Sequence, residues 1–192
     1  VSGLTIGKEA SADGTSDADV TISGETSISG PVTIYGGDIN LNESLNTSLG
    51  NQAGDVTLSA SQNIYLVPSK TITTNGGDVI FNSDSDANRS GGIRIGSDYE
   101  QTTFTTAIST NGGNIVLSGG LDPLTGFASY NSGLGAAFST YNFAIGVFGA
   151  TLDASSSNGA GGNIIVRGNS GNTFNGLIWK VNIGGQYGAN TI

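Results

Sequence analysis

The sequence predicts an all-β chain that folds as a parallel β-helix, a solenoid of short strands with one longer irregular or inserted segment. Three observations support this prediction. A glycine-rich motif followed by a short alternating strand recurs along the chain, glycine accounts for 32 of the 192 residues, and proline for only 3. No long stretch places apolar residues at helical spacing, because glycine interrupts the chain throughout.

The repeat consists of a Gly-Gly or Ala-Gly pair, then Asp or Asn, then an apolar-x-apolar triplet. Its two most similar copies are "TTNGGDVIFN" at 73–82 and "STNGGNIVLS" at 109–118. The complete copies begin at Gly36, Ala53, Gly76, Gly112 and Gly161, and a shortened copy without the polar residue begins at Gly91. A catalytic motif has no need to recur in this way, whereas a structural unit does, so the repeat predicts stacked coils.

Each part of the repeat has a physical role at a corner of such a coil. Glycine reaches positive φ without a Cβ clash, which suits a sharp turn. The following Asp or Asn can bond to nearby backbone, and stacked copies can form a side-chain ladder. The apolar-x-apolar triplet then points two side chains to one face. The regular part has a period of about 17 to 23 residues. The predicted core positions are Ile39, Val56, Val79, Ile115 and Ile164.

A sandwich or barrel built of hairpins is the competing architecture. It requires longer strands and two-residue turns. The strands between the repeats are shorter than that, as in 20–22, 32–34 and 64–66, and Asn-Gly-Gly precedes two strands in the same phase. Both features favour the solenoid.

Composition excludes several classes of function. The chain carries 15 acidic and 6 basic residues, so it lacks the basic surface that nucleic acids or anionic membranes require. No apolar run is long enough to predict membrane insertion. The chain has no Cys and no His, which removes Cys nucleophiles, Cys-based zinc sites and the commonest general base. Methionine is absent too, and we expect residues 1–192 to be one repeat domain, a fragment or processed piece of a larger exoprotein.

Two segments break the repeat. Residues 83–90, "SDSDANRS", are predicted to form a polar outward loop, and residues 121–150 form an irregular, aromatic-rich segment. The aromatic residues in or near this second segment are Phe127, Tyr130, Phe138, Tyr141, Phe143 and Phe148. They either fill a local core within irregular coils or form a surface on which sugars stack. Because loops on a rigid scaffold carry binding residues, Tyr130 and Tyr141 are the predicted ligand contacts.

The acidic residues of the repeat are candidate catalytic groups. Asp38, Asp55 and Asp78 recur in the same slot, and paired carboxylates can hydrolyse glycosidic bonds. Asn114 and Asn163 occupy that slot in other copies, however, and an amide cannot replace a catalytic carboxylate. The slot therefore favours a turn-holding role, and the chain is predicted not to be an enzyme.

Two further binding hypotheses rest on short motifs. Asp84 and Asp86 open a sequence similar to an EF-hand loop, but Arg89 replaces the required glycine and Ile95 replaces the final glutamate. An irregular calcium site near Asp84 and Asp86 therefore competes with a solvated acidic loop, and no other cofactor is predicted. Threonines at 71, 73, 74, 102, 103, 105 and 106 suggest a flat ice-binding array, although a regular Thr-x-Thr in each coil is absent.

The repeat copies resemble the repeat regions of filamentous-haemagglutinin-type adhesins and other large bacterial β-strand-repeat exoproteins. "ISTNGGNIVLSGGLDPLTG" at 108–126 is the most characteristic stretch, and the resemblance covers most of 20–120 and 150–168. It implies a right-handed parallel β-helix that is secreted or displayed on a bacterial cell surface and acts in cell adhesion or biofilm.

The resulting functional hypothesis is a non-catalytic structural or adhesive segment that contacts a glycan or another cell-surface ligand. The first alternative is a self-assembling extracellular filament subunit, in which copies associate end to end through open strand edges. The second alternative is a carbohydrate-binding or polysaccharide-active β-helix.

Overall fold

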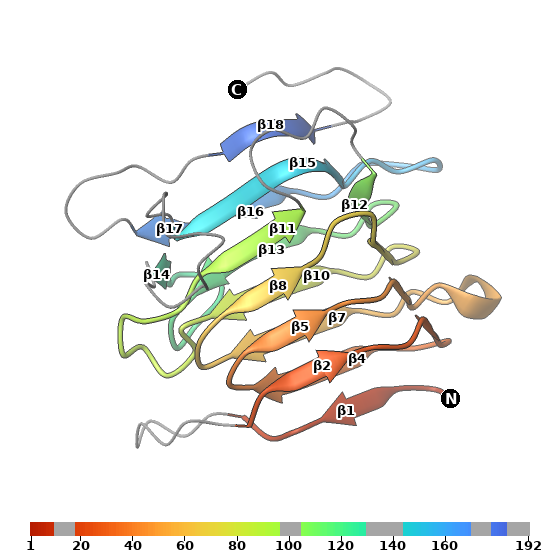
Figure 1. The fold of residues 1–192 in the computed structure, drawn as a ribbon. Helices are drawn as coiled ribbons and strands as arrows, with labels where there is room; N and C mark the ends of the chain where they lie inside the picture. The colour runs from red at the N-terminus through yellow and green to blue at the C-terminus, as the bar shows by residue number, and fades with distance from the viewer. Residues whose placement is uncertain (10–17, 97–104, 130–143, 170–177, 184–192) are drawn as a thin grey trace.

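The chain is all-β, with parallel strands in stacked, curled sheets (Figure 1). This computed structural model describes residues 1–9, 18–96, 105–129 and 144–169, together with the backbone of 178–183. Within these ranges, the only helical element is a single 3-10 turn at Leu49–Asn51. Every strand pair in the described part of the chain is parallel, which excludes the hairpin sandwich there.

The first sheet takes one strand from each pass of the chain. Its six strands lie in the order β1, β4, β7, β10, β13 and β16. Their bounds are Leu4–Ile6, Val32–Gly36, Val56–Ala60, Val79–Ser83, Ile115–Gly119 and Ile164–Val166. Each strand pairs with the strand one pass earlier and one pass later, so we call the stretch from one of these strands to the next a coil.

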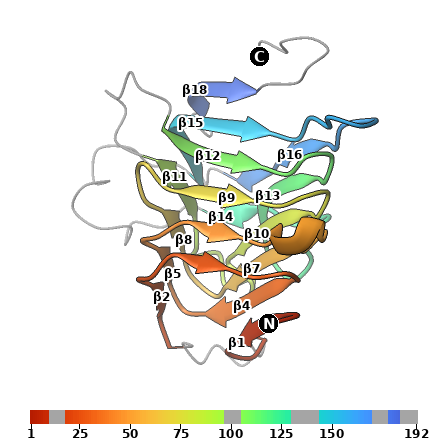
Figure 2. The ribbon, with the colours of Figure 1, turned by 90° about the vertical axis from the view of Figure 1, so that its right-hand side faces the viewer.

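The second sheet is bent into two faces (Figure 2). One face contains β2 (Val20–Ile22), β5 (Ile39–Leu41), β8 (Ile64–Leu66) and β11 (Ile93–Gly96). The other face contains β3 (Thr26–Ser27), β6 (Leu45–Asn46), β9 (Thr71–Thr73) and β12 (Thr106–Ser109). The long strand β15 (Ile145–Asp153) pairs with β11 and then with β12, which joins the two faces. Strand β18 (Ile178–Ile183) pairs with β15, and β14 (Ala128–Ser129) pairs with β17 (Gly168–Asn169).

The core lies between the three faces, where alternate residues of each strand stack on their counterparts in the next coil. In the first sheet, Val56, Val79 and Ile115 are paired in register and have no exposed surface. Ile39, in the second sheet, is equally buried. Ile164 packs against this core as predicted but is only half-buried, because among the described residues its strand β16 pairs with β13 alone.

The coils differ in length, and most steps are longer than the predicted period of about 17 to 23 residues. Equivalent residues of the first sheet's corner lie 23 residues apart for Asp55 and Asp78, and 36 apart for Asp78 and Asn114. The next step is 49 residues. The short predicted spacing came from comparing Ile39 with Val56, but these residues belong to different sheets.

The two glycines of a Gly-Gly pair have different roles. In the two Asn-Gly-Gly copies the first glycine has positive φ, +93° at Gly76 and +109° at Gly112, as the turn prediction requires, whereas Gly36, Gly91 and Gly161 have no positive φ. No positive φ is found at the second glycine, Gly77 or Gly113, but a Cβ on Gly113 would collide with the Gly77 carbonyl oxygen one coil below. The second glycine therefore permits close stacking of the backbone.

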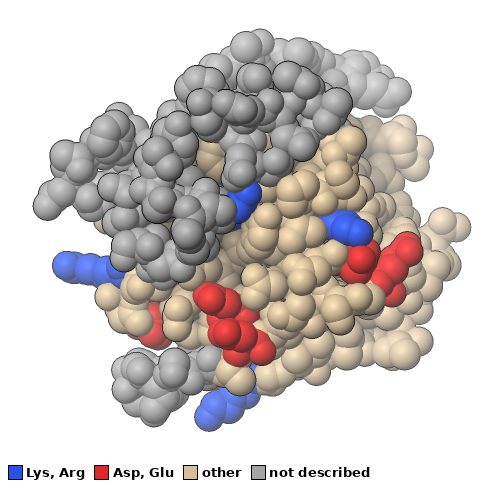
Figure 3. Space-filling model, in the orientation of Figure 1, with Lys and Arg blue, Asp and Glu red and all other residues tan. Residues whose placement is uncertain are grey.

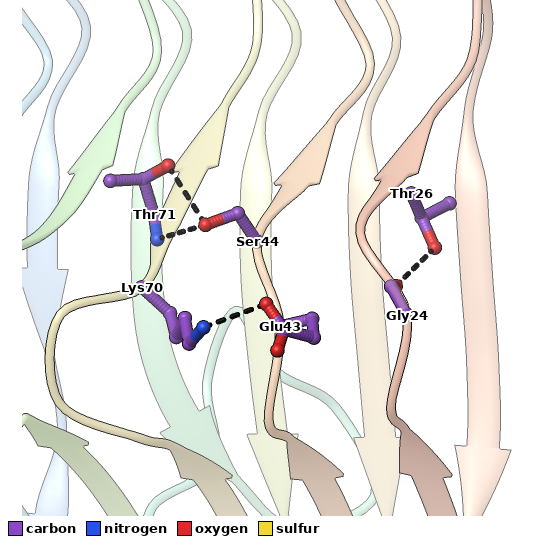
Figure 4. A network of polar contacts seen from close by, with 6 residues as sticks. All are labelled: Gly24, Thr26, Glu43, Ser44, Lys70 and Thr71. Atoms are coloured by element: carbon purple, nitrogen blue, oxygen red, sulfur yellow. Dashed lines mark hydrogen bonds and ion pairs between the residues drawn. The ribbon is translucent and has the colours of Figure 1, made fainter.

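The corner between the two faces of the second sheet is fixed by contacts from coil to coil (Figure 4). The Thr71 N–H donates to the Ser44 hydroxyl over 3.0 Å, and Lys70 Nζ lies 2.7 Å from Glu43 Oε2. Both charged side chains are partly exposed, so the ion pair contributes about 0–1 kcal/mol. These hydrogen bonds and the ion pair join neighbouring coils, and we assign them a structural role.

Candidate functional surfaces

A ladder of side chains runs up the corner that leads into the first sheet. Asp55 Oδ1 accepts the Asp78 N–H at 2.8 Å, and Asp78 Oδ1 accepts the Asn114 N–H at 2.7 Å. Asn114 Oδ1 then accepts the Asn163 N–H at 2.9 Å. Each side-chain oxygen thus binds the backbone of the next coil, which confirms the predicted ladder.

A second ladder stands at the start of the second sheet. Asp19 Oδ1 accepts the Asp38 N–H at 2.9 Å, and Asp38 Oδ1 accepts the Asn63 N–H at 3.0 Å. Asn63 Oδ1 accepts the Gly92 N–H at 2.9 Å. The ladder ends there because Gly92 belongs to the shortened copy and has no side chain. Asp38 is therefore not aligned with Asp55 and Asp78, and the expectation that all three share one slot was wrong.

The ladders determine what the repeated carboxylates can do. An Asp oxygen and an Asn amide oxygen accept the same backbone N–H, which explains why both residue types occupy the slot. Asn adds a donor, since Asn114 Nδ2 lies 3.1 Å from Asp78 Oδ1. Placing Asn after Asp also avoids a further like charge in the column. The described hydrogen bonds of these side chains hold the backbone of the next coil in place.

A column of buried threonines adjoins the first ladder and was missed from the sequence. The hydroxyls of Thr47, Thr74 and Thr110 donate to the carbonyl oxygens of Gly54, Gly77 and Gly113, at 2.5, 2.6 and 2.5 Å. Each Thr therefore closes the turn that precedes a strand of the first sheet. The signal was present in the sequence, since Thr stands two residues before the first Gly in both "TTNGG" and "STNGG".

The predicted ice-binding array is not formed by the threonines that the structure describes. Thr74 and Thr106 are buried. Thr71 and Thr73 are paired with Ala107 and Ser109 in the next coil, so Thr is not repeated there. The threonines at 102 and 103 lie outside the described residues.

The loop 83–90 is only partly outward, because its first residues are buried. Asp84 is 3% exposed, and its Oδ1 accepts the N–H groups of Arg89 and Ser90 at 2.9 and 3.2 Å. Burial raises the pKa of Asp84, while hydrogen bonds from Ser129, Ser90 and Arg89 act in the opposite direction. Asp84 has a φ of +52°, a backbone conformation that Asp and Asn tolerate better than most residues.

The carboxylates proposed for calcium are directed at their own loop. Asp86 Oδ2 accepts a hydrogen bond of 2.7 Å from Asn88 Nδ2, just as Asp84 accepts bonds from backbone N–H groups. In the part of the chain that the structure describes, no group of three or more Asp, Glu, His or Cys residues is placed to hold a metal ion. A calcium site near Asp84 and Asp86 stays a prediction.

The aromatic-rich segment 121–150 divides into different environments. Phe148 is 5% exposed and belongs to β15, so the final residues of the segment form a regular strand. Phe127 is 53% exposed. The predicted ligand contacts Tyr130 and Tyr141 both lie outside the described residues, as do Phe138 and Phe143.

The loop from Gly120 to Phe127 presents large apolar side chains to solvent. Leu121 is 71% exposed and Leu124 is 59% exposed. The loop is held by Asp122, whose carboxylate accepts the Leu124 N–H and the Thr125 hydroxyl, both at 2.9 Å. These hydrogen bonds lower the pKa of Asp122. Clustered exposed apolar side chains are typical of contact surfaces. The sequence does not predict the exposure of these two leucines in "LDPLTGF", because apolar side chains are usually buried.

The face drawn in Figure 3 offers little charge for recognition among its described residues. It is mostly uncharged, with scattered acidic and basic side chains. Within the described ranges, no helix is long and apolar enough to cross a membrane. No family model, curated protein or solved structure matches the chain.

Proposed function

We propose that this chain is a non-catalytic structural and adhesive segment of a secreted bacterial surface protein, acting in cell attachment or the biofilm matrix. The observation that carries the proposal is the ladder. Asp55 and Asp78 are the two repeated carboxylates that stack at one corner, where a catalytic pair would be expected. Each accepts a hydrogen bond from a backbone N–H of the following coil. Secretion and surface display follow from the resemblance to bacterial repeat adhesins.

The proposed architecture is a right-handed parallel β-helix. Connections between parallel strands of one sheet are right-handed in nearly all proteins, which supports this handedness. Neighbouring strands are about 4.8 Å apart, so each coil lengthens the stack by the same amount whatever the size of its loops. Such a stack suits a rigid spacer that holds contact loops away from its point of attachment.

Contact with a glycan or another cell-surface ligand is assigned to segment 121–150. Its described part exposes Leu121, Leu124 and Phe127 on a loop held by hydrogen bonds. An exposed aromatic ring can stack on the apolar face of a sugar. Tyr130 and Tyr141 are proposed as the polar-tipped partners of this surface.

The test is attachment to immobilised glycans and cells by the Tyr130→Ser, Tyr141→Ser double variant and by Phe127→Ser. We expect each variant to keep the wild-type melting temperature and to adhere less. Leu49→Ser is a matched control, because Leu49 is a 45% exposed apolar residue on a different loop. A double variant that melts much earlier, with unchanged adhesion per folded molecule, would show that these rings fill a core.

The absence of catalysis can be tested separately. Purified protein is expected to show no hydrolase or lyase turnover on common polysaccharides, with or without calcium. The polysaccharide-active alternative gains support if turnover is found and is abolished by Asp78→Asn, since that change preserves the ladder acceptor.

A filament subunit is the alternative that a specific observation favours. Among the described residues, strands β1 and β16 are the outer strands of the first sheet, and their inward side chains Leu4, Ile6, Ile164 and Val166 are only half-buried. Open parallel edges of this kind can pair with strands of a second copy. Electron microscopy at increasing protein concentration distinguishes the two ideas: lengthening fibres support a subunit, and constant particle length supports a spacer.

A further inference from the structure

The same reactive dipeptide occurs in different environments of this molecule. Asn-Gly pairs are described at Asn75–Gly76, Asn111–Gly112 and Asn158–Gly159, and a fourth pair at 175–176 lies outside the described residues. In an Asn-Gly pair, the backbone nitrogen of glycine can attack the Asn side-chain carbon Cγ, because glycine offers no steric hindrance. The reaction requires a freely rotating amide and an accessible glycine nitrogen.

Asn75 and Asn111 are held in a third side-chain column. Asn111 Nδ2 donates to Asn75 Oδ1 at 2.7 Å. Asn111 Oδ1 accepts the Ser157 N–H and hydroxyl at 3.0 and 3.1 Å. The Gly76 N–H donates to the Thr110 carbonyl at 2.7 Å, which occupies the nitrogen that would attack Asn75. Reaction at either residue therefore requires local opening of the stack.

Asn158 lies in the exposed connection between β15 and β16. Its backbone N–H donates to the Ser156 hydroxyl at 3.2 Å. Among the described residues, neither its side-chain amide nor the Gly159 N–H has a hydrogen-bond partner. A Cβ built on Gly159 would have no atom within 4 Å, so the surroundings are open.

We propose that Asn158 is a site of spontaneous deamidation to aspartate and isoaspartate, and that stacking protects Asn75 and Asn111. The Gly159 nitrogen gives its proton to a solvent base and bonds to Cγ, and the side-chain nitrogen leaves as ammonia. Water then opens the resulting succinimide at either carbonyl. The step needs only water and base, with no oxidation or reduction.

The modification changes a loop that contacts the third column. It adds one negative charge to a chain whose net charge is −9. The isoaspartate product also lengthens the backbone directly after Ser157, the residue that donates to Asn111. An aged molecule would therefore differ from a fresh one at the edge of the stack, while its core columns stay unchanged.

The experiment is incubation of the folded protein at mildly alkaline pH, followed by peptide mass spectrometry with isoaspartate detection. Chymotrypsin separates the sites, because residues that it cleaves after, such as Phe81, Leu117 and Phe174, lie between or beyond them. We expect deamidation at Asn158 at least about tenfold faster than at Asn75 or Asn111, equivalent to a local opening free energy of about 1.4 kcal/mol. In denaturant, the three rates should converge.

Gly159→Ala is the matched variant, since a methyl group fits the open space and hinders attack. It should slow the reaction at Asn158 and leave the melting temperature unchanged. Equal rates at the three sites in the folded protein would overturn the proposal. So would a rate order that persists unchanged in denaturant, because protection would then not depend on the fold.

Discussion

The corner that leads into the first sheet ends on the same glycine and Asp or Asn in successive coils, even where a loop is inserted before the glycine, whereas the corner that leaves it differs in length in every coil. We call these the leading and trailing corners. Thr74, Gly77 and Asp78 at the leading corner have counterparts in Thr110, Gly113 and Asn114. The trailing corner spans only Gly36 to Ile39 in one coil and the whole stretch from Gly119 to Ile145 in another.

The difference has a physical cause. At the leading corner, the second glycine of each repeat packs against the backbone one coil below, so no side chain fits at that position. Extra residues are accommodated only before this glycine, as in 48–53 and 155–160. At the trailing corner after β10, residues 87–89 are exposed, and β10 and β11 stay paired with the strands of the neighbouring coils. The closure entropy of a flexible loop rises by only about 0.6 kcal/mol for each doubling of its length. Both segments that break the repeat start at this corner: 83–90 begins at the last residue of β10, and 121–150 begins just after β13.

The sharpest test of this comparison is the same insertion at both corners. A short Gly-Ser insertion between Gly113 and Asn114 should unfold the domain, because it displaces the glycine column and the ladder together. The same insertion after Asn88, in the exposed part of the trailing loop, should cost only about 1 kcal/mol. Circular dichroism and urea unfolding measure both effects. Equal losses at the two positions would remove the distinction between the corners.

A smaller change examines the glycine column alone. Gly113→Ala should destabilise the protein by at least about 1–3 kcal/mol, because the new methyl group meets the Gly77 carbonyl oxygen. Gly24→Ala is the matched control, since a Cβ there has no atom within 4 Å. We expect the control to melt at or slightly above the wild-type temperature. Similar losses for both variants would mean that close stacking is not the reason for glycine at 113.

The repeat predicted the class of fold and much of its core. Alternation placed Val56, Val79 and Ile115 inside, and the interchange of Asp and Asn indicated a hydrogen-bonding slot. The pattern could not show that Asp38 and Asp55 stand at different corners, because both corners use the same local sequence. Assigning a copy to a corner depends on which strands pair, and strand pairing is a long-range property.

The sequence predicted burial and exposure in the loops less well than in the strands. Asp84 was placed in a polar outward loop, since a run of Ser and Asp is usually solvated. Its burial arises from the turn that follows β10, where the Ser85 N–H donates to the Ala60 carbonyl one coil below. The exposed Leu121 and Leu124 were likewise not expected, because exposure of apolar side chains runs against the usual preference for burial.

Asp84 lies at the trailing corner directly after β10, and its raised pKa makes the stability of the folded protein depend on pH. Its pKa is raised in the folded state, so the folded protein binds this proton more tightly than the unfolded chain. The contribution of Asp84 to stability is therefore most favourable below its ordinary pKa of 3.8 and declines as pH rises. Asn at this position keeps an acceptor for the Arg89 and Ser90 N–H groups and tolerates positive φ.

The measurement is the free energy of unfolding of wild type and Asp84→Asn across acidic to neutral pH. The variant should gain stability relative to wild type as pH rises above about 4, by about 1 kcal/mol or less near neutral pH. Asp122→Asn is the contrasting control, because the lowered pKa of Asp122 gives the opposite sign. A constant difference between Asp84→Asn and wild type at every pH would show that burial of Asp84 is not linked to folding.

The most direct test of the ladder is hydrogen exchange at the Asn114 N–H, whose partner is Asp78 Oδ1 at 2.7 Å. Asp78→Asn preserves an acceptor and should leave the Asn114 N–H protected. Asp78→Ala removes it and should speed exchange of this amide by about tenfold, while amides within β13 keep their protection. Unchanged protection of the Asn114 N–H in Asp78→Ala would contradict the claim that the repeated polar residues hold the coils together.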